Sequence, residues 1–504
     1  MKMTKGLILA SAAMFAGAGA QAADLPVKAK AIEYVKICSL YGAGFYYIPG
    51  TDTCIKLGGY LRADLALNTN SIYSNGRVNG VGGANNRLSN YYTTRSREDL
   101  SIDTRTATEY GVLRTFFEGV FTWTSGSYAG GGAGAGGGAT AYSGDGIAGG
   151  SLGVYYAFMQ FAGFTFGKAQ SQFSAPWSNY PGNNFDGLPG GGGWDPVNQF
   201  TYTADFGQGI SASFSAEDQV LHDTTNIWNV SGATAAGLAT GAYGANSIGG
   251  SRAPDLIAML RVDQSWGLVQ ASVAAHNNQA AYYGATELTG HPDNKWGWAG
   301  QLALSIKNIP TGAGDSISVQ GVYTNGASRY NFQQYTSSTY AMYRGTGLAG
   351  AYQSVGLAGL SDSVFVTGAG QELTTTYGFN GAFNHNWDPR WSTSIYGGWA
   401  AVRYNDTAKG YICGAFVSGL ALSSGIAGCN PDFNYSVVGM ITRWSPVKGL
   451  TFSADLAYTM LDQKYATGST VVLPTQAGIA KPGATYELKD QNTVSLLLRA
   501  QRSW

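Results

Sequence analysis

Charged residues that could act on a passing solute recur on the polar faces of short amphipathic segments. Seven of them form one candidate site, a pore constriction: Arg62, Arg97, Arg114, Glu118, Asp186, Asp195 and Arg499. The two aspartates lie in a long irregular stretch, 168–199, and the other five on predicted strands. Opposite charges across a narrow water gap would create a transverse field that orients dipolar solutes and passes small ions. In the alternative interpretation, the arginines pair locally with Asp64, Asp99 and Glu118, which share their faces.

No other set of residues forms a catalytic or metal-binding pattern. The histidines are scattered, with no Ser, Cys or Asp nearby that completes a motif, at His222, His276, His291 and His385. The glycine-rich tract 130–138 is not followed by the Lys-Ser/Thr of a phosphate-binding loop. The cysteines show neither a C-x-x-C nor a metal spacing. We therefore expect no enzymatic activity, no cofactor and no metal, and interpret the histidines as lumen or loop residues.

Four cysteines suit an oxidising compartment, in which disulfides form and persist. They allow three pairings. The local choice, Cys38 with Cys54 and Cys413 with Cys429, closes two loops of about 15 residues, and each disulfide would stabilise the fold by roughly 3 kcal/mol. Four buried free thiols are the alternative.

Residues 1–22 have the features of a secretory signal: two lysines, an apolar core, and the small-residue cleavage site Ala20-Gln21-Ala22. Without this leader, the 30 Lys and Arg become 28 against 30 Asp and Glu, a net charge of −2. Such a balance predicts no nucleic-acid partner. We divide the rest into an N-terminal segment with one disulfide, 23–57, and a barrel, 58–504. No other apolar run reaches 18 residues, so any membrane crossing must be made by strands.

The chain after the leader is dominated by segments with one apolar and one polar face. GYLRADLAL at 59–67 and ISASFSAE at 210–217 alternate apolar with polar residues, as a strand with two different faces does. We predict sixteen such strands, at 58–67, 97–106, 111–123, 152–161, 164–167, 199–206, 210–217, 256–263, 267–276, 298–307, 316–323, 374–385, 391–403, 434–444, 450–460 and 488–504.

Short turns and long loops alternate between these strands. The eight long connections fall at about 68–96, 124–151, 168–198, 218–255, 277–297, 324–373, 404–433 and 461–487. This pattern favours a transmembrane antiparallel β-barrel over a soluble sandwich or solenoid, because a sheet in lipid must close to pair its edges. With sixteen strands the lumen is aqueous. We expect the third loop, 168–199, to fold into the lumen, the alternative being one more surface loop.

Two terminal signatures resemble the alpha-proteobacterial general porins. They are YVKIC at 34–38 with YGAGFYYIPGTDTC at 41–54 and GYLR at 59–62, and the ending RAQRSW at 499–504; the run 157–168 is similar as well. The chain departs from the family in ending on Trp504, where porins usually end in Phe. Its third loop also lacks the acidic motif of enterobacterial porins.

The resemblance implies a homotrimeric outer-membrane barrel through which small hydrophilic solutes diffuse, surrounded by outer-membrane lipid and lipopolysaccharide. Two other functions stay open. A solute-specific channel, for example for a sugar, is suggested by the aromatic residues of the third loop: Trp177, Tyr180, Phe185 and Trp194. A structural or adhesive barrel would bind partners through its loops.

Overall fold

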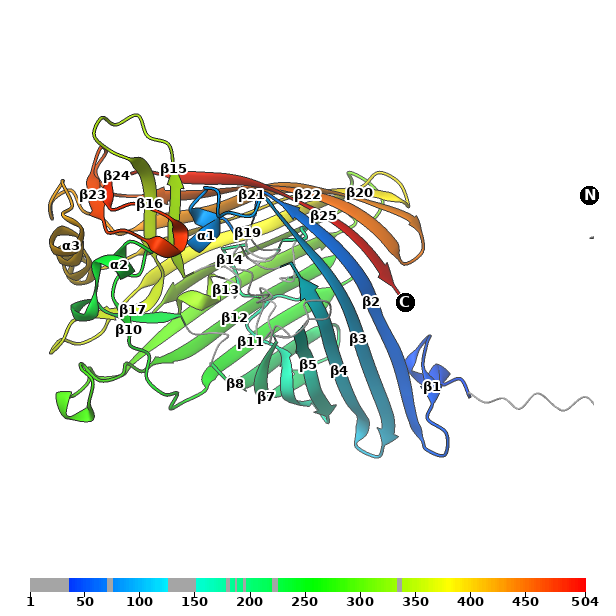
Figure 1. Cartoon of the computed structure of the whole chain (residues 1–504). Coiled ribbons are helices and arrows are strands. Elements are labelled where there is room, and N and C mark those ends of the chain that lie inside the picture. Colours follow the sequence, from blue (N-terminus) through cyan, green and yellow to red (C-terminus); the bar gives the residue numbers. More distant parts are fainter. Residues whose placement is uncertain are drawn as a thin grey trace, which may run out of the picture.

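The computed structural model describes residues 36–69, 76–125, 151–177, 182–185, 188–193, 196–219, 225–332 and 338–504. Within these residues, sixteen antiparallel strands form a closed barrel (Figure 1). They are β2 (Thr53–Leu67), β3 (Tyr92–Thr108), β4 (Gly111–Thr124), β5 (Ser151–Phe161), β6 (Phe164–Gln170), β7 (Pro196–Asp205), β8 (Ile210–Glu217), β11 (Asp255–Gln264), β12 (Gly267–Asn278), β13 (Lys295–Lys307), β14 (Ser316–Asn325), β19 (Thr375–Asn386), β20 (Trp391–Arg403), β21 (Phe433–Val447), β22 (Leu450–Gln463) and β25 (Gln491–Ser503).

The barrel closes where the first of these strands meets the last. β25 pairs antiparallel with β2, with Ala63 opposite Ala500. Every predicted strand overlaps an observed one, so the predicted sixteen-stranded barrel is confirmed. β2 begins at Thr53, so Cys54 lies on the first barrel strand.

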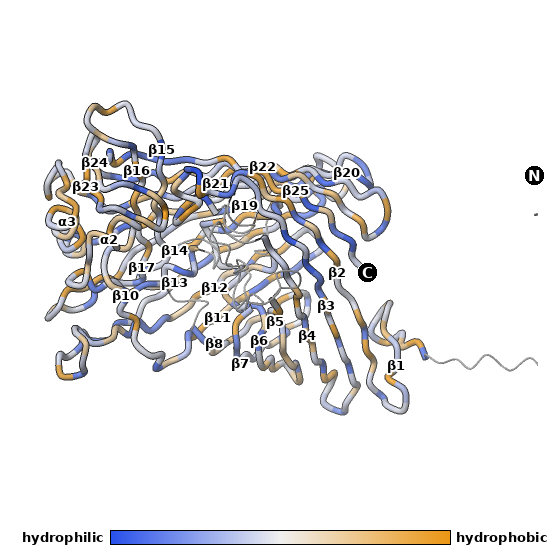
Figure 2. The backbone as a smooth tube through the Cα atoms, in the orientation of Figure 1, coloured by the Kyte–Doolittle hydropathy of each residue, from blue (hydrophilic) through white to orange (hydrophobic). Residues whose placement is uncertain are grey.

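The outside of the barrel is apolar and the inside is largely polar. On β13, Trp298 and Leu302 point outward and are 50% and 68% exposed, whereas Gln301 and Ser305 point inward and are buried. The same alternation can be followed along the strands in Figure 2. Within the described residues, no helix combines the length and the apolar character needed to cross a membrane.

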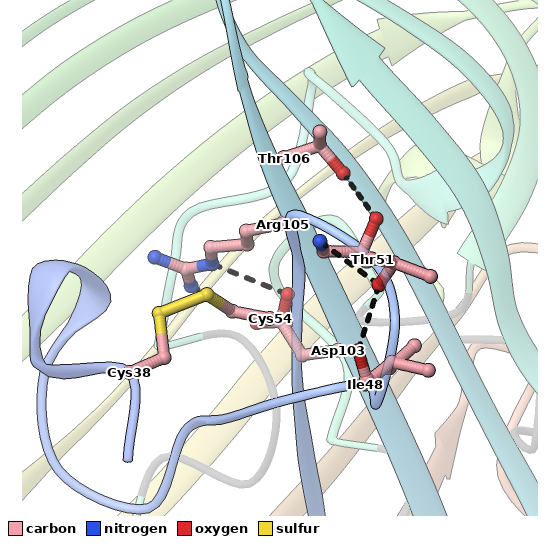
Figure 3. Close-up of a disulfide and its surroundings, with 8 residues drawn as sticks. Cys38, Ile48, Thr51, Cys54, Asp103, Arg105 and Thr106 are labelled. Carbon is pink, nitrogen blue, oxygen red and sulfur yellow. Dashed lines mark hydrogen bonds and ion pairs between the residues drawn. A yellow bond between two sulfur atoms is a disulfide. The ribbon is translucent and has the colours of Figure 1, made fainter. Parts of the chain in front are cut away.

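The two ends of the barrel differ. One end, which we call the turn end, carries the short connections, the C-terminus and the hairpin strand β1 (Tyr46–Tyr47) (Figure 1). The Cys38–Cys54 disulfide lies there, close to the Asp103–Arg105 ion pair (Figure 3). The other end, the loop end, carries the long connections and the Cys413–Cys429 disulfide. Both predicted disulfides are therefore confirmed.

The long connections contain regular elements that the sequence analysis did not predict. Two four-stranded sheets, β10-β9-β17-β18 and β15-β16-β24-β23, are built entirely from them. The strands are β9 (Asn226–Asn229), β10 (Ala245–Asn246), β15 (Thr339–Arg344), β16 (Gln353–Gly359), β17 (Ser361–Phe365), β18 (Glu372–Leu373), β23 (Thr470–Leu473) and β24 (Ala484–Leu488). The helices found among the described residues are α1 (Gly80–Gly83), α2 (Ala235–Leu238), α3 (Asp406–Leu420), η1 (Ser39–Tyr41), η2 (Val230–Gly232), η3 (Glu287–Thr289), η4 (Ser328–Tyr330) and η5 (Ala477–Ile479).

A hydrophobic core joins these loop elements to the barrel wall at the loop end. The ring of Tyr340 on β15 lies 5.5 Å from that of Phe433 and 5.1 Å from that of Tyr435 on β21. Val355 on β16 and Phe416 on α3 belong to the same buried cluster. The inner face of β21 is thus apolar near the loop end, where packed loop elements cover it.

Candidate pore site

An ion-pair cluster on the inner wall is formed by Asp64, Arg95 and Arg499. Register places Asp64 on β2 opposite Arg95 on β3 and opposite Arg499 on β25. One carboxylate oxygen of Asp64 lies 2.7 Å from Nε of Arg95, and the other lies 2.7 Å from Nε of Arg499. The Asp64 side chain is fully buried between the two guanidinium groups. Arg499 is therefore paired locally, as the alternative interpretation had it.

Two further arginines of the predicted site point inward beside this cluster. Arg62 donates from Nε to Gln501 Oε1 at 2.9 Å and stacks on Tyr60, and Arg97 donates from Nε to Thr122 Oγ1 at 3.0 Å. Both of these acceptors, Gln501 and Thr122, are neutral. The carboxyl groups of Asp99 and Glu118 lie within electrostatic reach of both arginines.

Arg114 belongs to a different cluster, nearer the turn end. Its Nη2 lies 3.0 Å from Asp103, which also pairs with Arg105 at 2.9 Å, and its Nη1 donates to Gln160. Along β4, Arg114 precedes Thr122, the partner of Arg97, by eight residues, or roughly 26 Å of strand. The structure therefore does not bring Arg114 together with the other three arginines of the predicted constriction.

The connection between β6 and β7 contacts strands far from its own. The side-chain amide of Asn184 donates to Ser453 on β22 at 2.7 Å, and Arg499 on β25 donates to Asn184 at 3.3 Å. The backbone N–H of Gly192 donates to Gln301 on β13 at 2.9 Å. In the order of the closed sheet, these wall strands lie well away from β6 and β7.

Gly190 of this connection lies tightly against the wall strand β19. Its φ is +98°, in the region that favours glycine, and a Cβ atom there would lie 2.0 Å from the carbonyl oxygen of Phe379 on β19. No larger residue fits this position without moving the backbone. The predicted charges of the connection, Asp186 and Asp195, lie outside the described residues, as do Tyr180 and Trp194.

A second buried polar network holds a loop against the wall on the other side of the lumen. Nδ1 of His276 on β12 lies 2.9 Å from Asp255 on β11, and its Nε2 lies 3.8 Å from Asp362 on β17. The hydroxyl of Tyr330 donates to Asp255 at 2.6 Å. This network ties the 326–374 connection to the wall. His276, interpreted from the sequence as a lumen or loop residue, thus has a structural role there.

The sequence analysis missed two residues of the ion-pair and loop contacts. Arg95 lies two residues before Arg97 and four before Asp99, and so it belongs to the same inward face of β3. The predicted strand began at 97, whereas β3 begins at Tyr92; a prediction with the earlier start would have included Arg95. Asn184 carries no such signal, because nothing local shows that it meets β22.

An apolar outer surface around a closed barrel with a charged inner wall is the architecture of a bacterial outer-membrane β-barrel protein. A family model described as "Porin subfamily" matches residues 24–497, so the chain belongs to that porin family, as its terminal signatures predicted.

Two porins of Brucella are similar to this chain in sequence, in agreement with the family assignment. The chain is 31% identical over 231 residues to porin Omp2a of Brucella melitensis, a match that covers 45% of this chain and 59% of that protein. It is 31% identical over 216 residues to porin Omp2b of Brucella suis, covering 42% and 53%. The chain thus spans somewhat more than half the length of these relatives. The outer-membrane channel DcaP of Acinetobacter baumannii has the same fold, with a TM-score of 0.55, 14% identity, and coverage of 91% and 99%.

Proposed function

We propose that this protein is a passive channel through which small hydrophilic solutes and ions cross the outer membrane. The observation that carries the proposal is the cluster of charged side chains on the inner wall of a closed barrel, around Asp64 and Arg499. Charged groups of both signs suit an aqueous path and not a packed core. By the general rule for such barrels, the loop end faces the cell exterior and the turn end the periplasm.

We infer further that the 168–199 loop crosses the lumen and forms its narrowest part. The contacts of Asn184 with β22 and of Gly192 with β13 support this inference, because two residues of this connection that are only eight positions apart reach walls on different sides. In this arrangement Arg62, Arg97 and Arg499 line one side of the passage. Asp186 and Asp195 supply the opposite charge from the loop. Glu118 lies beside Arg62 and Arg97, and Arg114 lines the path closer to the turn end.

The proposal is tested by single-channel recording in planar bilayers. Wild-type protein should give a conductance that rises with salt concentration without saturating. Deleting 183–192 should raise this conductance and admit larger solutes, since β6 and β7 keep their ladder partners. Replacing Asp186 and Asp195 by Asn should shift selectivity toward anions, most strongly at about 0.01 M salt, where the Debye length is about 30 Å. A wild-type barrel that does not conduct would refute the channel function.

We also propose a homotrimer, with β3 in its interface. Glu98 lies in the middle of β3 and points outward, opposite Leu61 on β2 and Phe121 on β4. A carboxylate in contact with lipid hydrocarbon is costly, so this face is better covered by protein. Thr104 and Thr115, hydrogen-bonded on the same outer face, extend the polar surface. The apolar outer faces elsewhere contact lipid and, in the outer leaflet, lipopolysaccharide.

A further inference from the structure

The connection between β14 and β19 turns back into the barrel at residues 326–332, which we call the inner segment. The hydroxyl of Tyr330 donates to Asp255 on β11 at 2.6 Å, and the side-chain amide of Asn331 donates to Thr376 on β19 at 3.0 Å. In the closed sheet, β12, β13 and β14 separate these two strands. All four residues are buried. The inner segment therefore bridges a broad part of the inner wall and is fixed to it at both ends.

Tyr330 of the inner segment packs on Phe173, near the start of the 168–199 connection. The centroids of the two rings lie 4.5 Å apart. Phe173 is fully buried and belongs to one hydrophobic cluster with Tyr330 and Ala327. Its backbone carbonyl oxygen accepts from the side-chain amide of Gln301 on β13 at 3.0 Å. Phe173 is thus held by the barrel wall and by the inner segment.

A second contact between the same two parts of the chain lies further along the 168–199 connection. Pro189 pairs with Phe332 in an isolated antiparallel bridge. The backbone N–H of Gly190 donates to the carbonyl oxygen of Asn331 at 2.8 Å. Phe332 is fully buried in the hydrophobic core of the loop end. At this point too, the connection is held by a wall strand, β19, and by the inner segment together.

The 168–199 connection needs such external support because four consecutive glycines occupy 190–193. Glycine loses more conformational freedom on folding than any other residue, so an ordered glycine run is costly. The run also lies too close to its surroundings for larger residues, since a Cβ atom at Gly191 would lie 2.3 Å from Gln320 on β14. Without side chains to anchor it, the run depends on partners outside it, among them Gln301 and Asn331, which accept from its backbone N–H groups.

We propose that Tyr330, Asn331 and Phe332 are positioning residues of the channel, which hold the 168–199 connection against the wall and thereby fix the width of the passage. The inference rests on the proposed function, in which that connection forms the narrowest part. It makes the connection between β14 and β19 a second determinant of what passes, although none of the three residues is charged. A 168–199 connection freed from the inner segment would move in and out of the passage, and the current through an open channel would fluctuate.

The first experiment compares two truncations of fully buried phenylalanines in the same connection. Phe332→Ala removes the side chain that packs beside Pro189, whereas Phe365→Ala on β17 changes a cluster with Ile227 and Ala280 that contains no residue of 168–199. Both substitutions should cost the loop end a similar amount of stability, because the same side chain is lost from a buried site. In planar bilayers, Phe332→Ala should raise the noise of the open-channel current severalfold and add brief closures. Phe365→Ala should record like wild type.

A second experiment makes the contact reversible. Pro189 has no N–H, so the bridge with Phe332 is a pair without mutual hydrogen bonds, in which the Cα atoms lie about 4.5 Å apart. A disulfide can span this distance. Pro189→Cys combined with Phe332→Cys should therefore give a quiet channel when oxidised and a fluctuating one when reduced. Wild type with its two native disulfides is the control, and the same reductant should leave its current quiet.

The outcomes separate the positioning role from the channel function. Equal noise in Phe332→Ala and Phe365→Ala would overturn the positioning role and leave the channel function standing. So would equal noise in the oxidised and reduced double-cysteine protein, once mass spectrometry has shown its disulfide. A wild type that does not conduct would refute the channel function. The positioning role is then decided by limited proteolysis within 168–199, which Phe332→Ala should accelerate and Phe365→Ala should not; equal rates would overturn it.

Discussion

The backbone N–H of Asn184 donates to a carboxylate oxygen of Asp455 at a distance of 2.5 Å. Asn184 belongs to the connection after β6, and Asp455 to β22, 271 residues further along the chain. Asp455 also accepts from the Tyr396 hydroxyl at 2.6 Å, so its position is held from two sides. A loop fastened in this way to a distant wall strand can set the width of a passage, which makes its contacts the best place to test function.

Gly190→Ala should widen the passage. The new Cβ would collide with the Phe379 carbonyl, and the positive φ of Gly190 adds strain, so the loop must leave β19. We expect a larger single-channel conductance with an intact barrel. Gly347→Ala is the control, because its Cβ meets nothing within 4 Å. Equal conductance in both variants would show that the loop does not narrow the pore at this contact.

Asp64→Asn should change both selectivity and stability. The substitution leaves Arg95 and Arg499 facing a neutral side chain, so the reversal potential in a KCl gradient should move toward anions. Removing one partner of a buried ion pair costs about 3 kcal/mol, which should lower the denaturant midpoint. Adding Arg499→Gln should restore part of both properties. If Asp64→Asn is as stable as the wild type, water solvates the guanidinium groups of Arg95 and Arg499 well enough to replace the carboxylate.

Glu98→Arg should break the proposed trimer. The substitution reverses the sign of a charge that the proposed interface covers, so the groups of the neighbouring subunit that face Glu98 no longer complement it, and the mass measured in detergent should fall to that of one chain. Leu302→Ser on β13, where the side chain is 68% exposed on the outer face, should leave the mass unchanged. A trimer that survives Glu98→Arg would place the interface on other strands.

Cys413→Ser with Cys429→Ser should loosen the loop end without affecting the barrel. The disulfide joins α3 to the segment that precedes β21 and closes a loop of about 15 residues, so its loss should cost roughly 3 kcal/mol locally. We expect faster proteolysis within 404–432 and an unchanged thermal unfolding of the barrel. Proteolysis at the wild-type rate would mean that the hydrophobic core alone holds α3.

Lys481 should titrate far below an ordinary lysine. Burial in the connection before β25 lowers the pKa of Lys481 from 10.5 to about 8, although its Nζ donates to Gln353 at 2.6 Å. Between pH 8 and 10.5 the unfolded chain binds a proton that the folded one does not, so stability rises with pH across this window. Lys481→Met should therefore stabilise the protein more at pH 7 than at pH 10.

The pKa itself can be read from ¹³C-methylated lysines by NMR. One resonance should titrate near pH 8 and be absent from Lys481→Met. If every lysine resonance titrates near its ordinary value, the burial of this amine in solution is less complete than in the structure.

The alternation of apolar and polar residues was sufficient to predict the barrel strands. The alternation at 59–67 and 210–217 identifies a strand whose faces meet different surroundings, because successive side chains of a strand point to opposite sides. The cysteine pairings could also be predicted from the sequence, since the two cysteines of each pair are only 16 residues apart. Both signals lie within one short window of sequence.

The sheets and the helix at the loop end had no such signal. β16 is buried on both faces, so its sequence does not alternate, and it pairs with β24, more than 120 residues away. α3 contains Gly410, Gly414 and Gly419, which obscure its helical character. Its N-cap Asn405, its disulfide and the burial of Phe416 hold it in place.

The sequence by itself determined the class of this protein, because an apolar face against lipid and a polar face against water impose a period of two on every strand. It also identified Arg62, Arg97 and Arg499 as inward charges, since that period assigns each residue to a face. Only the tertiary structure decided which charges meet. Asp64 finds Arg95 and Arg499 through strand register, Arg114 falls to another cluster, and Asn184 reaches Asp455 across the fold. Contacts of this kind depend on closure of the barrel and on the path of long loops, which no local window of residues encodes.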